Sequence, residues 1–207
     1  MKVALLVATA LVAVADWWSR WRDDERIERF AKPLATIGVI GLALVSGAPR
    51  EQITVAVVAL VLCLAGDVFL MPAIDRFVFG LASFLLGHLV FIVLFIQYGL
   101  DSAPLAGIAL VLAGLLIASV GQVIVRGAKV KDAALRTPVL AYLCVISAMA
   151  AFGWATGLPW VIAGSTLFVI SDAILGWGQF VRRRAWMPVA IMVTYHGAIG
   201  ALALSLW

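Results

Sequence analysis

Four ionisable side chains interrupt apolar stretches of this sequence, in places where a charge is costly. They are Asp67, His88, Asp172 and His196. A charged group inside a bilayer is unfavourable unless it is paired or hydrated, and carboxyl and imidazole groups are common proton donors and acceptors in enzymes. One such residue alone is most simply explained as a helix–helix hydrogen bond. Four of them predict a site for proton chemistry or proton transfer inside a membrane.

The depth of these residues along their helices predicts where the site lies. At a rise of about 1.5 Å per residue, all four fall near the middle of the predicted helices or in the half next to the basic loops. Tyr142, Ser83 and Tyr195 lie at similar depth. We therefore expect polar helix faces to enclose a hydrated pocket that opens toward the cytoplasmic leaflet. Lys32 lies at the expected mouth of this pocket, either as a snorkelling side chain or as a contact for a phosphate group.

The composition indicates that these residues belong to a polytopic membrane protein. The chain of 207 residues is 65% hydrophobic and only 13% charged, whereas soluble domains are about half apolar and about a quarter charged. A spanning helix needs about 20 mostly apolar residues, and these apolar runs are too long for the strands of a membrane barrel. The sequence therefore predicts an all-α bundle of about eight transmembrane helices in one transmembrane domain, residues 1–207. The expected spans are 3–18, 33–47, 53–71, 78–98, 103–125, 138–156, 159–180 and 187–206.

Basic residues are distributed unequally between the two ends of the predicted helices. Thirteen of the 15 Lys and Arg residues fall in or next to the first, third, fifth and seventh connections, and only Lys2 and Arg50 fall on the other side. The positive-inside rule then predicts a multi-pass protein of the inner membrane with both termini on the non-cytoplasmic side. This rule explains the basic balance better than nucleic-acid binding does. The run up to Ala15 resembles a signal peptide, but Trp17 and Trp18 fit an interfacial belt, so we expect a retained first helix.

Other classes of site are not indicated by the sequence. The chain contains no P-loop, HExxH, GxSxG or CxxC motif. Cys63 and Cys144 lie in apolar runs and are expected to be buried thiols that form no disulfide. The acids and histidines do not have the spacing of an established metal site, so we expect no metal and no cofactor.

A weak internal similarity relates the two halves of the chain. Residues 65–70 resemble residues 170–175, and each segment is followed one helix later by a histidine, His88 or His196. Two parallel halves of four helices each would place these residues at equivalent positions, because four crossings restore the starting side. Short apolar segments also match by chance, so both interpretations stay open.

Motifs spread along the chain give it a resemblance to a known family. They are Lys32-Pro33, Gly66-Asp67-Val68-Phe69-Leu70, the segment FGLASFLLGH at 79–88, Phe168-Val169-Ile170-Ser171-Asp172 and Thr194-Tyr195-His196. With this order and spacing over nearly the whole chain, the sequence resembles the YhhN family, which includes the animal lysoplasmalogenases. The GD, GLxSFxxGH and FxxSD elements are fairly specific together, although each alone would be weak.

The resemblance implies a membrane hydrolase that cleaves the vinyl-ether bond of lysoplasmalogen, or of a related lysolipid, to a fatty aldehyde and a glycerophospho head group. The implied partners are a lysophospholipid substrate and the bilayer. Ile199 stands where the family often has Gln, which leaves the exact substrate open. The family's polar positions correspond to the acids Asp67 and Asp172 and to Ser83, His88 and Ser171.

The chemistry of an enol ether fits a pair of acids. Hydrolysis starts with protonation of the β-carbon and continues with addition of water to the oxocarbenium ion, and two carboxyl groups in different environments can divide these tasks. The deeper group is expected to stay protonated. We therefore assign Asp172 as the acid and Asp67 as the base that orients water, with the reverse assignment left open. His88, Tyr195 and His196 would tune the pair through hydrogen bonds.

Two other classes of function fit part of the same pattern. Intramembrane Asp and His residues also act as proton relays, which suits a proton-coupled carrier of a small molecule or lipid. The small size of the chain and the clustering of polar groups in one half of the membrane count against a path across it. In a purely structural or lipid-sensing protein, the ionisable residues would only join helices. The sequence does not indicate an oligomeric state.

Overall fold

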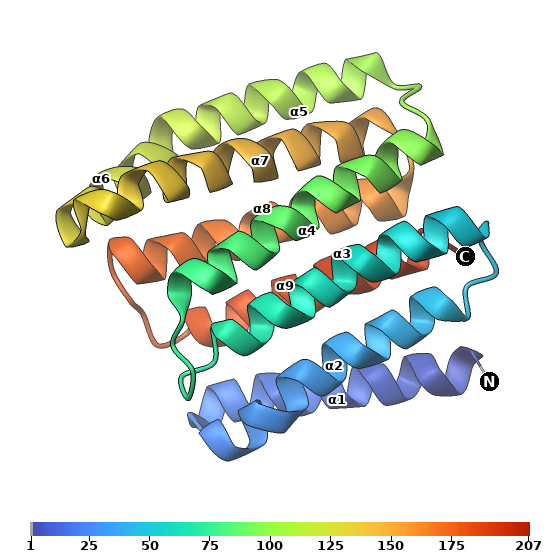
Figure 1. Cartoon of the computed structure of the whole chain (residues 1–207), viewed down its shortest axis with the longest axis horizontal. Coiled ribbons are helices and arrows are strands. Elements are labelled where there is room, and N and C mark those ends of the chain that lie inside the picture. Colours follow the sequence, from blue (N-terminus) through green and yellow to red (C-terminus); the bar gives the residue numbers. More distant parts are fainter. Residues whose placement is uncertain (1) are drawn as a thin grey trace.

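The computed structural model describes residues 2–207, and within this range the chain is helical and has no strand. The α-helices lie side by side in an elongated bundle (Figure 1). Because α5, a π-helical segment and α6 form one uninterrupted helix, Ala103–Lys131, the described range contains eight helical rods, and the predicted all-α bundle is confirmed. The helices are α1 Lys2–Arg22, α2 Glu25–Leu44, α3 Arg50–Phe69, α4 Phe77–Tyr98, α5 Ala103–Leu116, η1 Ile117–Gly121, α6 Gln122–Lys131, η2 Ala133–Leu135, α7 Arg136–Ala155, α8 Pro159–Phe180 and α9 Met187–Leu204.

The length and composition of the helices identify a multi-pass membrane protein. Within the described range, seven helices are long and apolar enough to cross a bilayer. The first residues of α1 and the last residues of α9 lie at the same end of the bundle (Figure 1). There, Nζ of Lys2 donates to the carbonyl of Ser46 at 2.6 Å and lies 4.8 Å from the ring centroid of Trp207. Most of the basic residues lie at the opposite end, in or near the α1–α2, α3–α4, α6–α7 and α8–α9 connections.

The second helix begins earlier than the sequence predicted. α2 starts at Glu25, so it includes eight residues that precede the predicted span 33–47. Asp24 caps the helix, because its Oδ1 accepts from the amides of Arg26 and Ile27 at 3.0 and 3.2 Å. Pro33 therefore lies inside the helix and not at its start, which was the expected place. The charged residues of the first turns concealed the helix from a search for apolar runs.

The fifth predicted span is also longer than expected. Its helix continues past residue 125 to Lys131 and contains the π-helical segment η1. The last turns carry basic side chains but bury Ile124 and Ala128 beside Val139 of α7. The other spans agree with the prediction to within a few residues at each end.

The two cysteines differ in exposure. Cys63 is buried, as the sequence predicted. Cys144 is exposed on α7, and the prediction that it is buried was wrong.

Glycine allows close contact between helices at several places in the bundle. A Cβ atom on Gly66 of α3 would lie 2.6 Å from the ring of Phe84, and one on Gly164 of α8 would lie 2.7 Å from Leu202. These two positions lie in the pairs α3–α4 and α8–α9, which are the most extensively packed. Small residues at helix interfaces are typical of membrane proteins, where close packing replaces the hydrophobic effect between helices. This packing fixes the rotation of the helices that carry the polar side chains.

A substitution at Gly127 should show how tightly α6 is held. A Cβ atom at this position would overlap the backbone carbonyl of Phe180 at the end of α8. We expect Gly127→Ala to destabilise the protein by about 1–3 kcal/mol, because the contact is with backbone and cannot be relieved by a rotamer change. Thermal unfolding in detergent measures this. Gly114→Ala is the matched control, because a Cβ there meets no atom within 4 Å, and equal stability of both variants would contradict the prediction.

Candidate functional site

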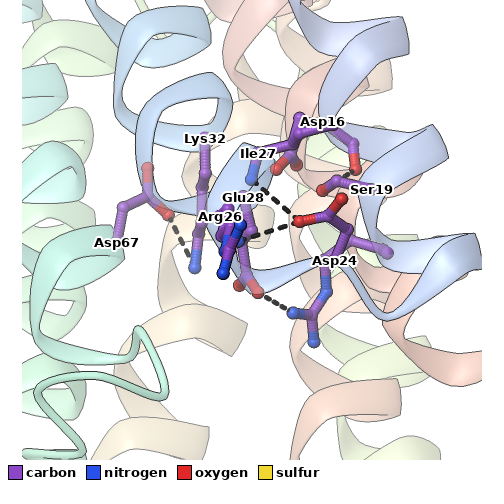
Figure 2. A network of polar contacts seen from close by, with 9 residues as sticks. Asp16, Ser19, Asp24, Arg26, Ile27, Glu28, Lys32 and Asp67 are labelled. Atoms are coloured by element: carbon purple, nitrogen blue, oxygen red, sulfur yellow. Dashed lines mark hydrogen bonds and ion pairs between the residues drawn. The ribbon is translucent and has the colours of Figure 1, made fainter.

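The carboxylate of Asp67 is the centre of a buried polar cluster between α2, α3 and α9. Thr36 Oγ1 and the Tyr195 hydroxyl both donate to Oδ2 of Asp67, each at 2.7 Å. Nζ of Lys32 lies 3.5 Å from Oδ1 (Figure 2). Asp67 is 1% exposed and Lys32 is 5% exposed, so this ion pair lies inside the protein. A cation and two hydroxyl donors together stabilise the ionised carboxylate against the cost of burial.

The positions of these side chains follow from the geometry of α2. Lys32 and Thr36 are four residues apart, so they lie on the same face of the helix, which is turned toward α3. Nζ of Lys32 is thereby placed at the buried carboxylate of Asp67. Thr36 was not predicted as a site residue. Its spacing from Lys32 is the signal that could have identified it.

The carboxylate of Asp172 belongs to a second cluster, between α4, α7 and α8. The Tyr142 hydroxyl donates to Oδ2 of Asp172. Nε2 of His88 lies 3.0 Å from the Tyr142 oxygen and 3.4 Å from the same Asp172 oxygen. His88 is fully buried, and its ring packs edge-on against Phe168 with centroids 4.6 Å apart. The Asp172 side chain is more open, with 11% of its surface exposed.

Asp67 and Asp172 line the same cavity, although they belong to different clusters. The cavity has a volume of about 100 Å³ and also touches Lys32, Ser171 and Tyr195. A volume of this size admits several water molecules beside polar walls. Within the folded protein, Asp67 is the more buried of the two acids and Asp172 is the more open one. The geometry can present two carboxyl groups with different neighbours to one small molecule.

The α1–α2 end of the cavity carries further charges. Arg20 of α1 forms an ion pair with Glu28 of α2, and both residues line the cavity. Asp16, one turn before Arg20, is fully buried (Figure 2). Its main-chain carbonyl accepts from Ser19 at 2.7 Å, but neither of its carboxylate oxygens hydrogen-bonds to another residue of the range 2–207. Asp16, Arg20 and Glu28 were not predicted as site residues.

Three predicted site residues have other contacts. His196 of α9 faces α1, where its Nδ1 accepts from the indole nitrogen of Trp17 at 3.0 Å. Because an indole can only donate, Nδ1 of His196 carries no proton and the ring is neutral. Ser83 donates to the carbonyl of Phe79 in its own helix, away from the cavity. Ser171 lines the cavity and donates to the carbonyl of Ile191 at 3.1 Å, which ties α8 to α9.

The fold and the site define a helical membrane protein with two intramembrane carboxyl groups on one polar cavity. The chain belongs to the YhhN family, whose model matches residues 27–206, and the resemblance inferred from the sequence motifs is confirmed. Over 124 residues the chain is 32% identical to proteins named lysoplasmalogenase from Mycobacterium bovis and Mycobacterium tuberculosis, which covers 59% of this chain. The chain matches about half of the length of these curated relatives, 48%. No solved structure matches the chain.

Proposed function

We propose that this protein is a hydrolase that cleaves the vinyl-ether bond of a lysoplasmalogen, or of a related lysolipid, inside the membrane. The observation that carries the proposal is that Asp67 and Asp172, on different helices, line one cavity together with Lys32. The products are a fatty aldehyde and a glycerophospho head group. The name of the two mycobacterial relatives supports the same reaction.

Asp172 is the proton donor in the proposed reaction. It is the more open of the two acids. Its neighbours are the Tyr142 hydroxyl and the His88 imidazole, whereas Asp67 has the ammonium group of Lys32 beside it. The carboxyl proton goes to the β-carbon of the enol ether, which turns the ether oxygen and the α-carbon into an oxocarbenium ion. The resulting Asp172 carboxylate then stabilises this cation electrostatically, and Tyr142 holds the carboxylate in place.

Asp67 is the base that orients water. Its Oδ2 receives two hydroxyl donors and its Oδ1 faces Lys32, so the group is set up as a carboxylate. Water loses a proton as it adds to the α-carbon of the oxocarbenium ion, which gives a hemiacetal. The hemiacetal then collapses to the aldehyde: the Asp172 carboxylate takes its hydroxyl proton, and Asp67 gives the leaving oxygen of the head group the proton that it took from water, which returns both acids to their starting states.

The basic side chains at the mouth of the cavity are suited to the head group. Arg20 and Lys32 both line the cavity on the side of the α1–α2 connection. A phosphate group there would meet a guanidinium and an ammonium, which are the usual partners of phosphate in proteins. Lys32 then has two roles, as counter-ion of Asp67 and as a contact for the head group.

Purified protein incubated with lysoplasmalogen should release fatty aldehyde. An ester-linked lysolipid with the same chain length is the control, and it should yield no aldehyde because it has no enol ether to protonate. Aldehyde is measured by mass spectrometry after trapping with a hydrazine. Uptake of lysolipid into proteoliposomes without aldehyde would contradict the hydrolase and would favour the proton-coupled carrier.

We also propose that both ends of the described chain face the non-cytoplasmic side of the inner membrane. The support is the concentration of Lys and Arg at the opposite end of the bundle. Alkaline phosphatase fused after Trp207 should be active, and green fluorescent protein at the same place should be dark. Fusions after Lys131 are the control and should behave in the opposite way. A fluorescent fusion after Trp207 would reverse the orientation.

A further inference from the structure

A second cavity lies on the other side of Asp172 and is almost wholly apolar. It has a volume of about 50 Å³ and is lined by residues of α4, α5, η1, α6, α7 and α8. Most of its lining side chains are aliphatic or aromatic, and Tyr142, Ser147 and Asp172 are the lining residues that carry polar side-chain groups. Asp172 also lines the polar cavity described above. This carboxyl group therefore stands at the boundary between a polar space and an apolar one.

A further apolar cavity lies next to this one, along α5, and Asp172 does not line it. This neighbouring cavity of about 100 Å³ shares Leu116, Ser147 and Val169 with the first and reaches toward Trp154. The lining residues of the α5–α6 helix run from Ala109 to Ile124, which is roughly 22 Å at 1.5 Å per residue. The hydrocarbon layer of one leaflet is about 15 Å thick, half of the bilayer core. The lining residues of the two cavities, called the apolar track below, thus extend along this helix for more than the thickness of one leaflet.

The surroundings of this track favour entry from the bilayer. α5 packs mainly against α7 and lies at the edge of the bundle (Figure 1). Much of its surface is exposed and apolar, and Gly114 has open space where a Cβ would lie. The π-helical segment η1 lines the same cavity as Asp172, through residues that include Gly121. Such π-segments are common at functional sites, because they offset the faces of a helix without ending it.

We propose that this apolar track holds the hydrocarbon chain of the lysolipid, with the chain entering beside α5 and its ether end at Asp172. The inference rests on the proposed function, because the position of the enol ether fixes which end of the chain meets the acid. In an alkenyl ether the carbon that accepts the proton is the second carbon of the chain, so it lies at the junction of head group and tail. Asp172 stands at the matching junction of the two cavities.

A bulky residue inside the track should block long chains and spare short ones. Ser147→Phe fills the place where the two apolar cavities meet, whereas Ala141→Phe adds the same bulk on the exposed side of the same helix. For a substrate whose chain extends past this point, we expect kcat/KM of Ser147→Phe to fall about tenfold or more, since overfilling a packed site has a cost of that size. A substrate whose chain ends before this point should be turned over at nearly the wild-type rate by both variants. An equal loss for both chain lengths, or none, would overturn the proposal.

A lysolipid with a diazirine at the end of its chain gives a readout that needs neither turnover nor a variant. Photolysis with the wild-type protein should label α5 and α7 around Ala113 and Ser147, and unlabelled lysolipid should compete. Labelling of other residues would overturn the chain site even if aldehyde is released. The same holds if diacyl phospholipid reduces the labelling and unlabelled lysolipid does not. Labelling at these residues without aldehyde release would keep the chain site and would instead refute the proposed hydrolysis.

Discussion

Asp172→Asn is expected to lower the rate of aldehyde release by about 10²–10⁴-fold, which is the usual contribution of a general acid. The amide keeps the shape of the side chain and can still accept from the Tyr142 hydroxyl, so the helix contacts should survive. The loss arises because the amide has no proton of suitable acidity to give to the β-carbon. Steady-state kinetics with a lysoplasmalogen substrate measure this, and thermal unfolding in detergent shows whether the fold is retained.

Asp101→Asn is the matched control for this variant. Asp101 is exposed in the α4–α5 connection and lines neither of the two cavities that contain Asp172, so its loss should leave the rate unchanged. A folded Asp172→Asn protein with the wild-type rate would remove Asp172 from the mechanism. A large loss in both variants would point to a general effect of charge on the preparation.

Lys32→Met should destabilise the protein by about 3–5 kcal/mol, because it leaves the buried Asp67 carboxylate without its counter-ion. Methionine has a similar length and fills the same space, so the effect comes from charge and not from a cavity. We expect a clearly lower unfolding temperature in detergent, whereas Lys129→Met, on the exposed side of α6, should change it little.

The second half of this experiment is the double variant Lys32→Met with Asp67→Asn. Removing both charges should restore most of the stability that Lys32→Met loses, because no unpaired charge remains inside the protein. The amide oxygen introduced by Asp67→Asn would still accept from the hydroxyl groups of Thr36 and Tyr195. If the two single effects simply add, the two side chains do not interact in the folded protein. Activity should stay low in the double variant, since the base is gone.

The sequence predicted the helices well where apolar runs have clear ends. The span expected at 159–180 coincides with α8, and the one expected at 78–98 begins one residue later than α4. α2 was placed wrongly because its first turns are charged, although the cap at Asp24 is visible in the sequence. Hydropathy finds the part of a helix inside the bilayer, and it does not find the turns in the interface.

The sequence gives the position of each polar residue along its helix, but it does not show toward which neighbouring helix the side chain points. Tyr195 and His196 lie at nearly the same depth, yet adjacent helical residues point about 100° apart. Tyr195 therefore faces Asp67, while His196 faces Trp17 of α1. Which face of α9 is turned inward depends on its packing with α8 and α1, and hydropathy along the chain does not contain that information. The same limitation concealed the contact between Thr36 and Asp67.

The position of Asp172 between a polar and an apolar cavity has a consequence for product release. In the proposed reaction, cleavage at this boundary divides one amphiphile into two molecules of opposite solubility. The water-soluble fragment is left beside Arg20 at the basic end, and the oily fragment is left beside α5 and the lipid. Each molecule can then leave directly into the phase that dissolves it, by a separate exit.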